Sequence, residues 1–398
     1  MFGIFKFPTD APEIENALKN SVGDAVTIRT IKARNPLLFL EQLDDSWRPL
    51  LDRLVDVQTQ AKLAVRDPNY LHPHVAEVDR SAVRWRRLRM RYELRARTII
   101  SRLRTVRLRA GAIWNGQLSD PAVIAHALRL TNVPALFAEL APFPGRCFLD
   151  HVGVNGASSL QQVRPEALAP HPDEAALFER LKSSYRGRRA GKATSGDPAD
   201  LPKQFVFAAL QVPLDTQVLL HGDKLSRHAD YIALLGEVAR HLPGDVRLLV
   251  KPHPQAPYRE EYLRSELGSS VLIGGHFETR DLLERCRAVI TINSSIGPDA
   301  FLFDKPVIAL GRAPWIKPGL AVKADGAPEV ADAIVNAAGF DRTLRQRFLA
   351  HWYHSYTFAT GGDETALPAF IEGKVAAARE GMVRRVDTIE PSSVEHRL

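Results

Sequence analysis

Two apolar runs in the second half of the chain, Arg247 to Val250 and Ala288 to Ile292, are each followed at once by polar side chains. Ammonium, imidazole and hydroxyl groups, together with the free N–H groups at the start of a helix, are the donors that commonly hold a phosphate. The sequence therefore predicts a phosphate site. Its first candidates are Lys251 and His253 after the first run, and Asn293, Ser294 and Ser295 after the second.

The elements that would position these side chains form a parallel sheet. Both runs are rich in β-branched residues, and a third run, Pro306 to Leu310, follows a short helical pattern. Strands that alternate with helices indicate a parallel βαβαβ unit. In such open sheets ligands bind beyond the carboxyl ends of the strands, which is where the polar side chains stand.

A second α/β segment precedes the first along the chain. Short apolar runs at Ala112–Trp114, Pro134–Ala138 and Cys147–Leu149 alternate with a helix that Ser119 or Asp120 would cap. This pattern again resembles βαβ. It predicts a second group of site residues, which would face the phosphate-binding residues of the other segment. Its candidates, each at the end of a strand, are Asn115, Gly116, Glu139 and Asp150.

Composition indicates a globular chain long enough for two domains: 398 residues, 45% of them hydrophobic and 25% charged. We find neither a long apolar run nor a basic start followed by an apolar core, so we expect no membrane span or secretory signal and a cytoplasmic location. Cys147 and Cys286 are far apart in apolar surroundings, which predicts reduced core residues. No group of His, Cys and Asp has the sequence spacing of a metal site.

The net charge of +7 is unevenly distributed, because eleven arginines lie between Arg84 and Arg109 among apolar residues with helical spacing. One face of such a helix could pack while the others carry charge. A solvated surface helix is the simplest interpretation. Contact with an anionic inner membrane surface or an acidic glycan is the alternative, and nucleic acid is disfavoured because aromatic residues are sparse.

Several motifs, taken together, resemble the capsule polysaccharide synthesis family, that is, the KpsC- and KpsS-like retaining β-Kdo glycosyltransferases and the Kdo transferase module of WbbB. The resemblance covers roughly residues 110 to 315, and its most specific parts are D-x-x-G-V-N and Q-V-x-x-D-T-Q. The motifs are ELAPFP from Glu139, FLDHVGVN ending at Asn155, LQVPLDTQ ending at Gln217, KPHP from Lys251, TINSSIGPDA ending at Ala300, and KPVIALG ending at Gly311.

The resemblance implies transfer of 3-deoxy-manno-octulosonic acid (Kdo) from CMP-β-Kdo to a saccharide acceptor with retention of configuration. Retention by two inversions needs a carboxylate below the anomeric carbon and an acid/base group above it. Asp215 resembles the family's nucleophile, and Glu139, with Asp150 second, is the predicted acid/base. Structural roles remain open for all three: a helix N-cap for Asp215, and hydrogen bonding within the N-terminal domain for the others.

The remaining site residues are predicted to hold the donor. His253 of the HP motif and Lys251 would supply donors to the leaving phosphate beside Ser294 and Ser295, and Asp299 would accept from the ribose hydroxyls. A nucleoside monophosphate held in this way requires no divalent ion, so we expect no cofactor and no metal. Further contacts with donor or acceptor are predicted for Gln211, Gln217, Asn293, Asn115, Gly116 and Asn155.

The fold class that follows is α/β and GT-B-like, with two Rossmann-like domains across a cleft. The predicted domains are residues 1–190, an acceptor-side domain with a helical basic extension; 200–340, the nucleotide-sugar-binding domain; and 341–398, helices that pack back on the first domain and a polar tail. The linker between the first two is rich in Gly, Ser and Lys.

Two alternatives stay open at this stage. The same fold could use a UDP- or GDP-linked sugar, or the chain could be a non-catalytic partner in glycan assembly. The expected partners are a nucleotide-sugar donor and a saccharide or lipid-linked saccharide acceptor, whose identity the sequence does not give.

Overall fold

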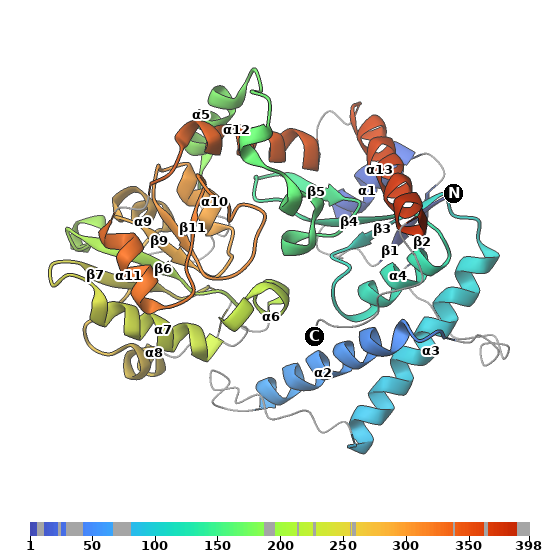
Figure 1. Cartoon of the computed structure of the whole chain (residues 1–398), viewed down its shortest axis with the longest axis horizontal. Coiled ribbons are helices and arrows are strands. Elements are labelled where there is room, and N and C mark those ends of the chain that lie inside the picture. The colour runs from blue at the N-terminus through green and yellow to red at the C-terminus, as the bar shows by residue number, and fades with distance from the viewer. Residues whose placement is uncertain are drawn as a thin grey trace.

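The computed structural model describes residues 1–5, 12–22, 25–28, 43–66, 81–186, 196–212, 215–225, 228–254, 256, 260–336, 339–361 and 365–387. Two sheets, each covered by helices, lie side by side (Figure 1). Most of the predicted linker, residues 187–195, and the end of the predicted tail lie outside the described residues. Short 3-10 turns occur at η2 (Asn155–Ala157), η3 (Ser159–Gln162), η4 (Pro165–Ala167), η5 (Pro198–Asp200) and η6 (Asp223–Leu225).

The sheet of the second half is parallel throughout its described strands. Its order is β11-β10-β9-β6-β7-β8. Most of its strands are buried on both faces, which is why they appear in the sequence as continuous apolar runs. The strands are β6 (Phe205–Ala209), β7 (Arg247–Lys251), β8 (Leu272–Ile273), β9 (Val289–Thr291), β10 (Val307–Ala309) and β11 (Val322–Lys323). The helices between and after them are α6 (Thr216–His221), α7 (His228–His241), α8 (Glu260–Leu267), α9 (Thr279–Arg285), α10 (Ile296–Phe301) and α11 (Ala327–Val335).

The strand order of this sheet places a ligand site at one point. It is the doubly wound order in which the first and fourth strands are neighbours, and here those strands are β6 and β9. The chain leaves them in opposite directions, so a crevice opens beyond their carboxyl ends. The segments that begin at Gln211 and Asn293 leave the sheet at this crevice.

The sheet of the first half differs from the prediction in two ways. No strand was predicted before Ala112, but two short strands occur there and join the sheet in the order β12-β5-β4-β3-β1-β2. The run FGIF is only four residues long and buried on both faces, which leaves no periodicity to detect. The strands are β1 (Phe2–Phe5), β2 (Ala25–Ile28), β3 (Ala110–Trp114), β4 (Ala135–Leu140), β5 (Arg146–Asp150) and β12 (Thr357–Ala359).

The second difference is the direction of β5. The pattern predicted a parallel βαβ continuation, but β5 pairs antiparallel with β4, with Glu139 opposite Phe148 and Phe137 opposite Asp150. A tight connection through Gly145, at φ 65°, reverses the chain. An antiparallel strand ends at the other edge of the sheet, so Asp150 does not share the carboxyl edge with Glu139.

Helices cover both faces of the first sheet. One face packs against α1 (Pro12–Val22) and α13 (Leu367–Asp387), and the other against α2 (Trp47–Arg66), α3 (Val83–Thr105) and α4 (Ser119–Leu130). Because β12 pairs with β5 and α13 packs against β4, the C-terminal part of the chain contributes to the first sheet.

Two adjacent helices, α5 (Glu174–Ser184) and α12 (Arg342–Tyr356), bridge the two halves (Figure 1). The buried Arg345 fixes the first half of α12 to the second domain, since its guanidinium donates to Leu320 O at 2.7 Å and to Lys305 O at 2.9 Å. The far end of α12 is tied to the first sheet by Arg146, which donates to the hydroxyl of Thr357 at 2.6 Å.

The arginine-rich segment forms α3, and part of its charge is paired. Arg89 donates to Asp52 at 2.8 Å, Arg97 to Glu93 at 2.8 Å, and Arg95 pairs with Asp120 of α4. Within the described part of the chain, every helix is too short or too polar to cross a bilayer.

Candidate active site

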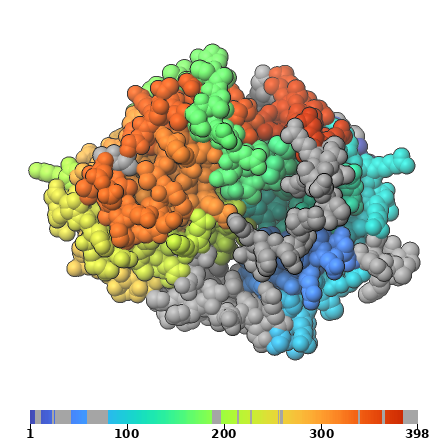
Figure 2. Space-filling view, viewed as in Figure 1, coloured from blue at the N-terminus to red at the C-terminus, as the bar shows by residue number. Residues whose placement is uncertain are grey.

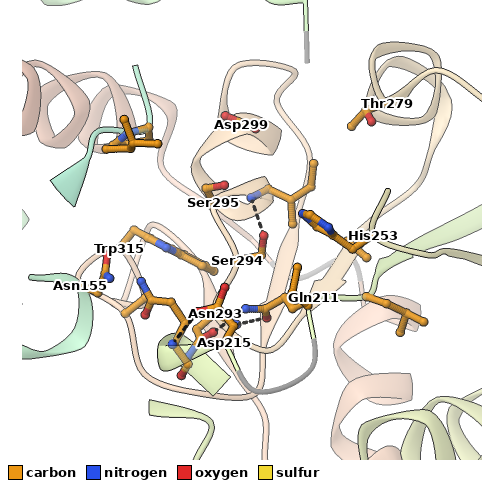
Figure 3. Close-up of a pocket in the computed structure, with 18 of the residues that line it drawn as sticks. Asn155, Gln211, Asp215, His253, Thr279, Asn293, Ser294, Ser295, Asp299 and Trp315 are labelled. Carbon is orange, nitrogen blue, oxygen red and sulfur yellow. Dashed lines mark hydrogen bonds between the residues drawn. The ribbon is translucent and has the colours of Figure 1, made fainter. Parts of the chain in front are cut away.

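A cleft of about 610 Å³ lies between the two halves (Figures 2 and 3). Its wall combines polar groups at strand ends with aromatic rings. Except for Gly116 and Asp150, every predicted site residue lines it. From the first half come Asn115, Glu139 and Asn155, and from the second come Gln211, Asp215, Gln217, Lys251, His253, Asn293, Ser294, Ser295 and Asp299.

Glu139 projects into the cleft near the end of β4. One carboxylate oxygen accepts from the amide of Asn115 at 2.8 Å and the other from the N–H of Leu140 at 2.9 Å. Burial, and then the negative charge of Asp215, raise the pKa of Glu139 above its ordinary value, and the two hydrogen bonds oppose this without cancelling it. The ionised form of a carboxyl group with a raised pKa is a better proton acceptor than an ordinary glutamate.

Asn115 is positioned by the sharp turn after β3. It has a left-handed φ of 58°, and the next residue, Gly116, has φ 78°. A Cβ on Gly116 would lie 2.4 Å from the ring of Phe137, so only glycine permits this turn. Gly116, predicted as a ligand contact, therefore acts by shaping the backbone that aims Asn115 at Glu139.

Asp215 is the N-cap of α6. Its carboxylate accepts from the N–H of Gln217 at 2.8 Å, which stabilises the first turn of that helix. Asp215 therefore has the N-cap role that the sequence left open, and this role is compatible with a catalytic one. The residue also lines the cleft, and its charge influences Glu139 from the opposite half.

Asp150 does not reach the cleft, and its prediction as a second acid/base is wrong. The residue is fully buried, and its oxygens accept from the N–H of His151 at 2.7 Å, and from the N–H and the hydroxyl of Ser159 at 2.5 and 2.8 Å. Burial would raise its pKa, but these hydrogen bonds outweigh burial and lower it. Asp150 is an ionised carboxylate that holds the loop after β5, and Glu139 is left as the acid/base candidate.

Asn293 and Gln211 form a buried clamp at the cleft wall, and their contact with a nucleotide stays a prediction. The Gln211 side chain donates to the amide oxygen of Asn293 at 3.0 Å and accepts from its backbone N–H at 3.2 Å. The amide nitrogen of Asn293 donates to Gln217 O at 2.8 Å and to His221 O at 2.9 Å. Both carbonyls belong to α6, so this pair fixes the helix that Asp215 caps.

The clamp predicts that Asn293→Ala destabilises the fold. Buried carbonyls of α6 would lose their donor and Gln211 its partner, which costs about 2–4 kcal/mol in the free energy of unfolding. Urea denaturation measures this. Asn336→Ala is the matched control, because that side chain donates only to Asp332 on an exposed helix end. Equal midpoints for the two variants would rule out a clamp.

The side chains predicted to bind phosphate line the part of the cleft wall formed by the ends of β7 and β9. The N–H of Ser294 donates to Thr291 Oγ1 at 3.1 Å, and the Ser294 hydroxyl accepts from the N–H of Ile296 at 3.3 Å. The ammonium of Lys251 donates to Gly275 O at 3.2 Å and to Phe277 O, and burial lowers its pKa. Lys251 is therefore held by backbone carbonyls at the cleft wall.

Comparison with known proteins adds an independent finding. Residues 168–357 match the family model described as capsule polysaccharide biosynthesis protein. These residues, somewhat less than half of the chain, are similar to the capsule polysaccharide biosynthesis family. The matched segment contains α5, the whole second sheet and α12, whereas Glu139 and Asn115 lie before it.

Curated relatives are similar to this chain over part of their length. Protein FixF of Sinorhizobium fredii is 28% identical over 251 residues, which are 61% of this chain and 59% of FixF. The capsule polysaccharide modification protein LipB of Neisseria meningitidis serogroup A is 29% identical over 126 residues, 29% of this chain and 30% of LipB. The chain thus spans less than two thirds of either relative.

A solved structure supports the fold. The chain is similar to the β-Kdo 2,7 transferase of KpsC from Thermosulfurimonas dismutans, with a TM-score of 0.50, 13% identity, and coverage of 94% of this chain and 98% of that one. At this identity the likeness concerns the fold, and it confirms the predicted GT-B-like class.

Several cleft residues were not predicted. For Trp315, the sequence signal is the glycine of the S-S-I-G segment. A Cβ on Gly297 would lie 2.4 Å from the Trp315 ring, so this glycine makes room for the tryptophan of PWIKPG. Tyr185, which donates to Asp299 at 3.3 Å, had no such signal. The other unpredicted polar or aromatic residues of the lining are Phe148, Ser158, Arg186, Phe207, Thr216, Glu278, Thr279 and Trp352.

Proposed function

We propose that this chain is a retaining glycosyltransferase that moves β-Kdo from CMP-β-Kdo to a saccharide acceptor in the synthesis of a bacterial surface polysaccharide. The observation that carries the proposal is a pair of carboxylates from opposite halves of the molecule, Glu139 and Asp215, that line one cleft and interact by charge. The similarity of residues 168–357 to the capsule polysaccharide biosynthesis family supports the substrate class.

The first chemical step uses Asp215. Its carboxylate oxygen forms a bond to the anomeric carbon while the bond from that carbon to the phosphate oxygen of CMP breaks, and CMP leaves with the electron pair. The hydroxyls of Ser294 and Ser295, with His253, are the donors at the cleft wall predicted to bind phosphate, where negative charge develops on the leaving group. No divalent ion is required for this step.

The second step uses Glu139. The ionised carboxylate takes the proton of the acceptor hydroxyl, whose oxygen attacks the anomeric carbon as the bond to Asp215 breaks. Two inversions give net retention. The raised pKa of Glu139 suits this role, since a more basic carboxylate is the better proton acceptor.

A donor panel tests the proposal. The protein is incubated with CMP-β-Kdo, and separately with UDP- and GDP-linked sugars, and release of each nucleotide is compared with a protein-free control. We expect catalysed release from CMP-β-Kdo alone. Turnover with a UDP- or GDP-linked sugar instead would show that CMP-β-Kdo is not the donor. If no donor is turned over, the result would favour a non-catalytic role for the chain in glycan assembly.

Peripheral contact with an anionic inner membrane surface stays a prediction. Its support is the start of α3, where Arg84, Arg87 and Arg91 are exposed together with the apolar Val83 and Met90. Flotation with liposomes tests it, and equal recovery with and without acidic lipid would count against it. The cytoplasmic location also stays a prediction.

A further inference from the structure

A polar cluster outside the cleft brings together three side chains that the sequence keeps apart. His171 Nδ1 lies 2.5 Å from Asp173 Oδ1, and His354 Nε2 lies 3.1 Å from the same oxygen. The two imidazole rings are stacked, with centroids 4.1 Å apart and an angle of 13° between their planes. His171 and Asp173 precede α5, and His354 lies in the last turn of α12.

The three potential ligand atoms lie within 4.8 Å of one another, so they converge on one point. Two imidazole nitrogens and a carboxylate oxygen are a ligand set that zinc and similar ions take, with bonds of about 2.0–2.2 Å. Tetrahedral ligands at such bond lengths lie roughly 3.4 Å apart, so small rotations of these side chains would accommodate an ion. The side chains are between 33% and 39% exposed, which leaves room for such rotations and for a water ligand.

The surroundings show what an ion here would join. The two bridging helices are connected by a row of polar contacts: Arg342 donates to Glu179 at 3.0 Å, and Arg347 lies 3.8 Å from Glu174. The cluster continues this row at the end of α12, next to Trp352, whose ring lines the cleft. An ion at this position would fix the helix that carries part of the cleft wall to the segment before α5.

We propose that His171, Asp173 and His354 bind a first-row divalent transition-metal ion, with Zn²⁺ as the best match, and that this ion joins α12 to the segment before α5. The site is structural, because its ligands lie outside the cleft lining. It is independent of the proposed transfer reaction, which uses no metal.

Cobalt binding to the full-length chain tests the site. The protein is first dialysed against a chelator and then titrated with Co²⁺, whose visible absorption becomes intense in a four-coordinate site, and Zn²⁺ is added to displace it. We expect one strong site per chain, and at least tenfold weaker binding in His354→Ala and Asp173→Asn. His241→Ala is the matched control, since His241 is exposed and contacts only a carbonyl of its own helix.

Thermal unfolding with and without Zn²⁺ separates a metal site from a hydrogen-bonded cluster. We expect Zn²⁺ to raise the unfolding temperature of the wild type and of His241→Ala, but not of His354→Ala, whose metal-free form must first show a cooperative transition. Asp173→Asn serves the same purpose if His354→Ala does not fold. The proposal is wrong if the variants bind Co²⁺ as the wild type does, or if Zn²⁺ leaves the wild type unchanged.

Discussion

Asp215→Asn is expected to reduce the rate of sugar transfer on the order of a thousandfold or more, while the protein stays folded. An amide oxygen is too weak a nucleophile to displace CMP, so the first step would stop. The fold should tolerate the change, because asparagine is as good an N-cap as aspartate and can still accept from the N–H of Gln217. The removed charge is therefore the main chemical difference.

Rates of CMP release and the intact mass of the protein after incubation with donor measure this effect. The wild type or a slowed variant should gain the mass of one sugar on Asp215, and Asp215→Asn should gain none. The matched control is Asp341→Asn, because Asp341 caps α12 by accepting from the N–H of Leu344 at 2.9 Å, in the same way that Asp215 caps α6. A rate for Asp215→Asn close to that of the control would show that Asp215 serves only as a cap.

The second half of the site was predictable because one sheet carries it. In the doubly wound strand order β6 and β9 are neighbours, so their carboxyl ends lie side by side. The residues that directly follow these two strands in the sequence must therefore lie close together. Gln211, Asp215 and Asn293 lie where this rule puts them. The separate roles of these residues were not predictable. The clamp formed by Asn293 and Gln211 depends on which carbonyls of α6 lie within hydrogen-bond distance of the Asn293 amide.

The first half shows where the same rule fails. A run such as Cys147–Leu149 indicates a strand but not its direction, and direction decides at which edge of the sheet the next residue lies. Because β5 runs antiparallel, Asp150 became a buried structural carboxylate, whereas Glu139 stayed at the carboxyl edge of β4. The four-residue strand β1 was missed because a run of that length has no measurable period.

Contacts between distant segments were outside the reach of the sequence. Tyr185, at the end of α5, contacts Asp299 of α10, and His354 of α12 contacts Asp173 just before α5, because helices far apart in the sequence pack together. Neither pair has a spacing that a sequence pattern encodes. The packing of the bridging helices therefore decides part of the cleft wall and the whole of the proposed metal cluster.

Glu139→Gln is expected to slow transfer by roughly 10²–10⁴-fold and to make the protein more stable at neutral pH. Transfer by the wild type should rise with pH through the raised pKa of Glu139, because only the ionised carboxylate can take the acceptor's proton, and this rise should disappear in the variant. Since the first step does not need Glu139, the variant should accumulate the sugar adduct on Asp215 that Asp215→Asn cannot form.

The stability effect follows from the same raised pKa. A carboxyl group whose pKa is higher in the folded than in the unfolded state stabilises the fold only while it is protonated, and this contribution is lost as pH rises through the folded value. The glutamine side chain of the variant would stay neutral, so the unfolding temperature of the variant should exceed that of the wild type at neutral pH and approach it in acid. Glu237→Gln, on the exposed side of α7, should change neither activity nor this difference. A Glu139→Gln variant that transfers sugar at the wild-type rate, with the same pH dependence, would remove Glu139 from the mechanism.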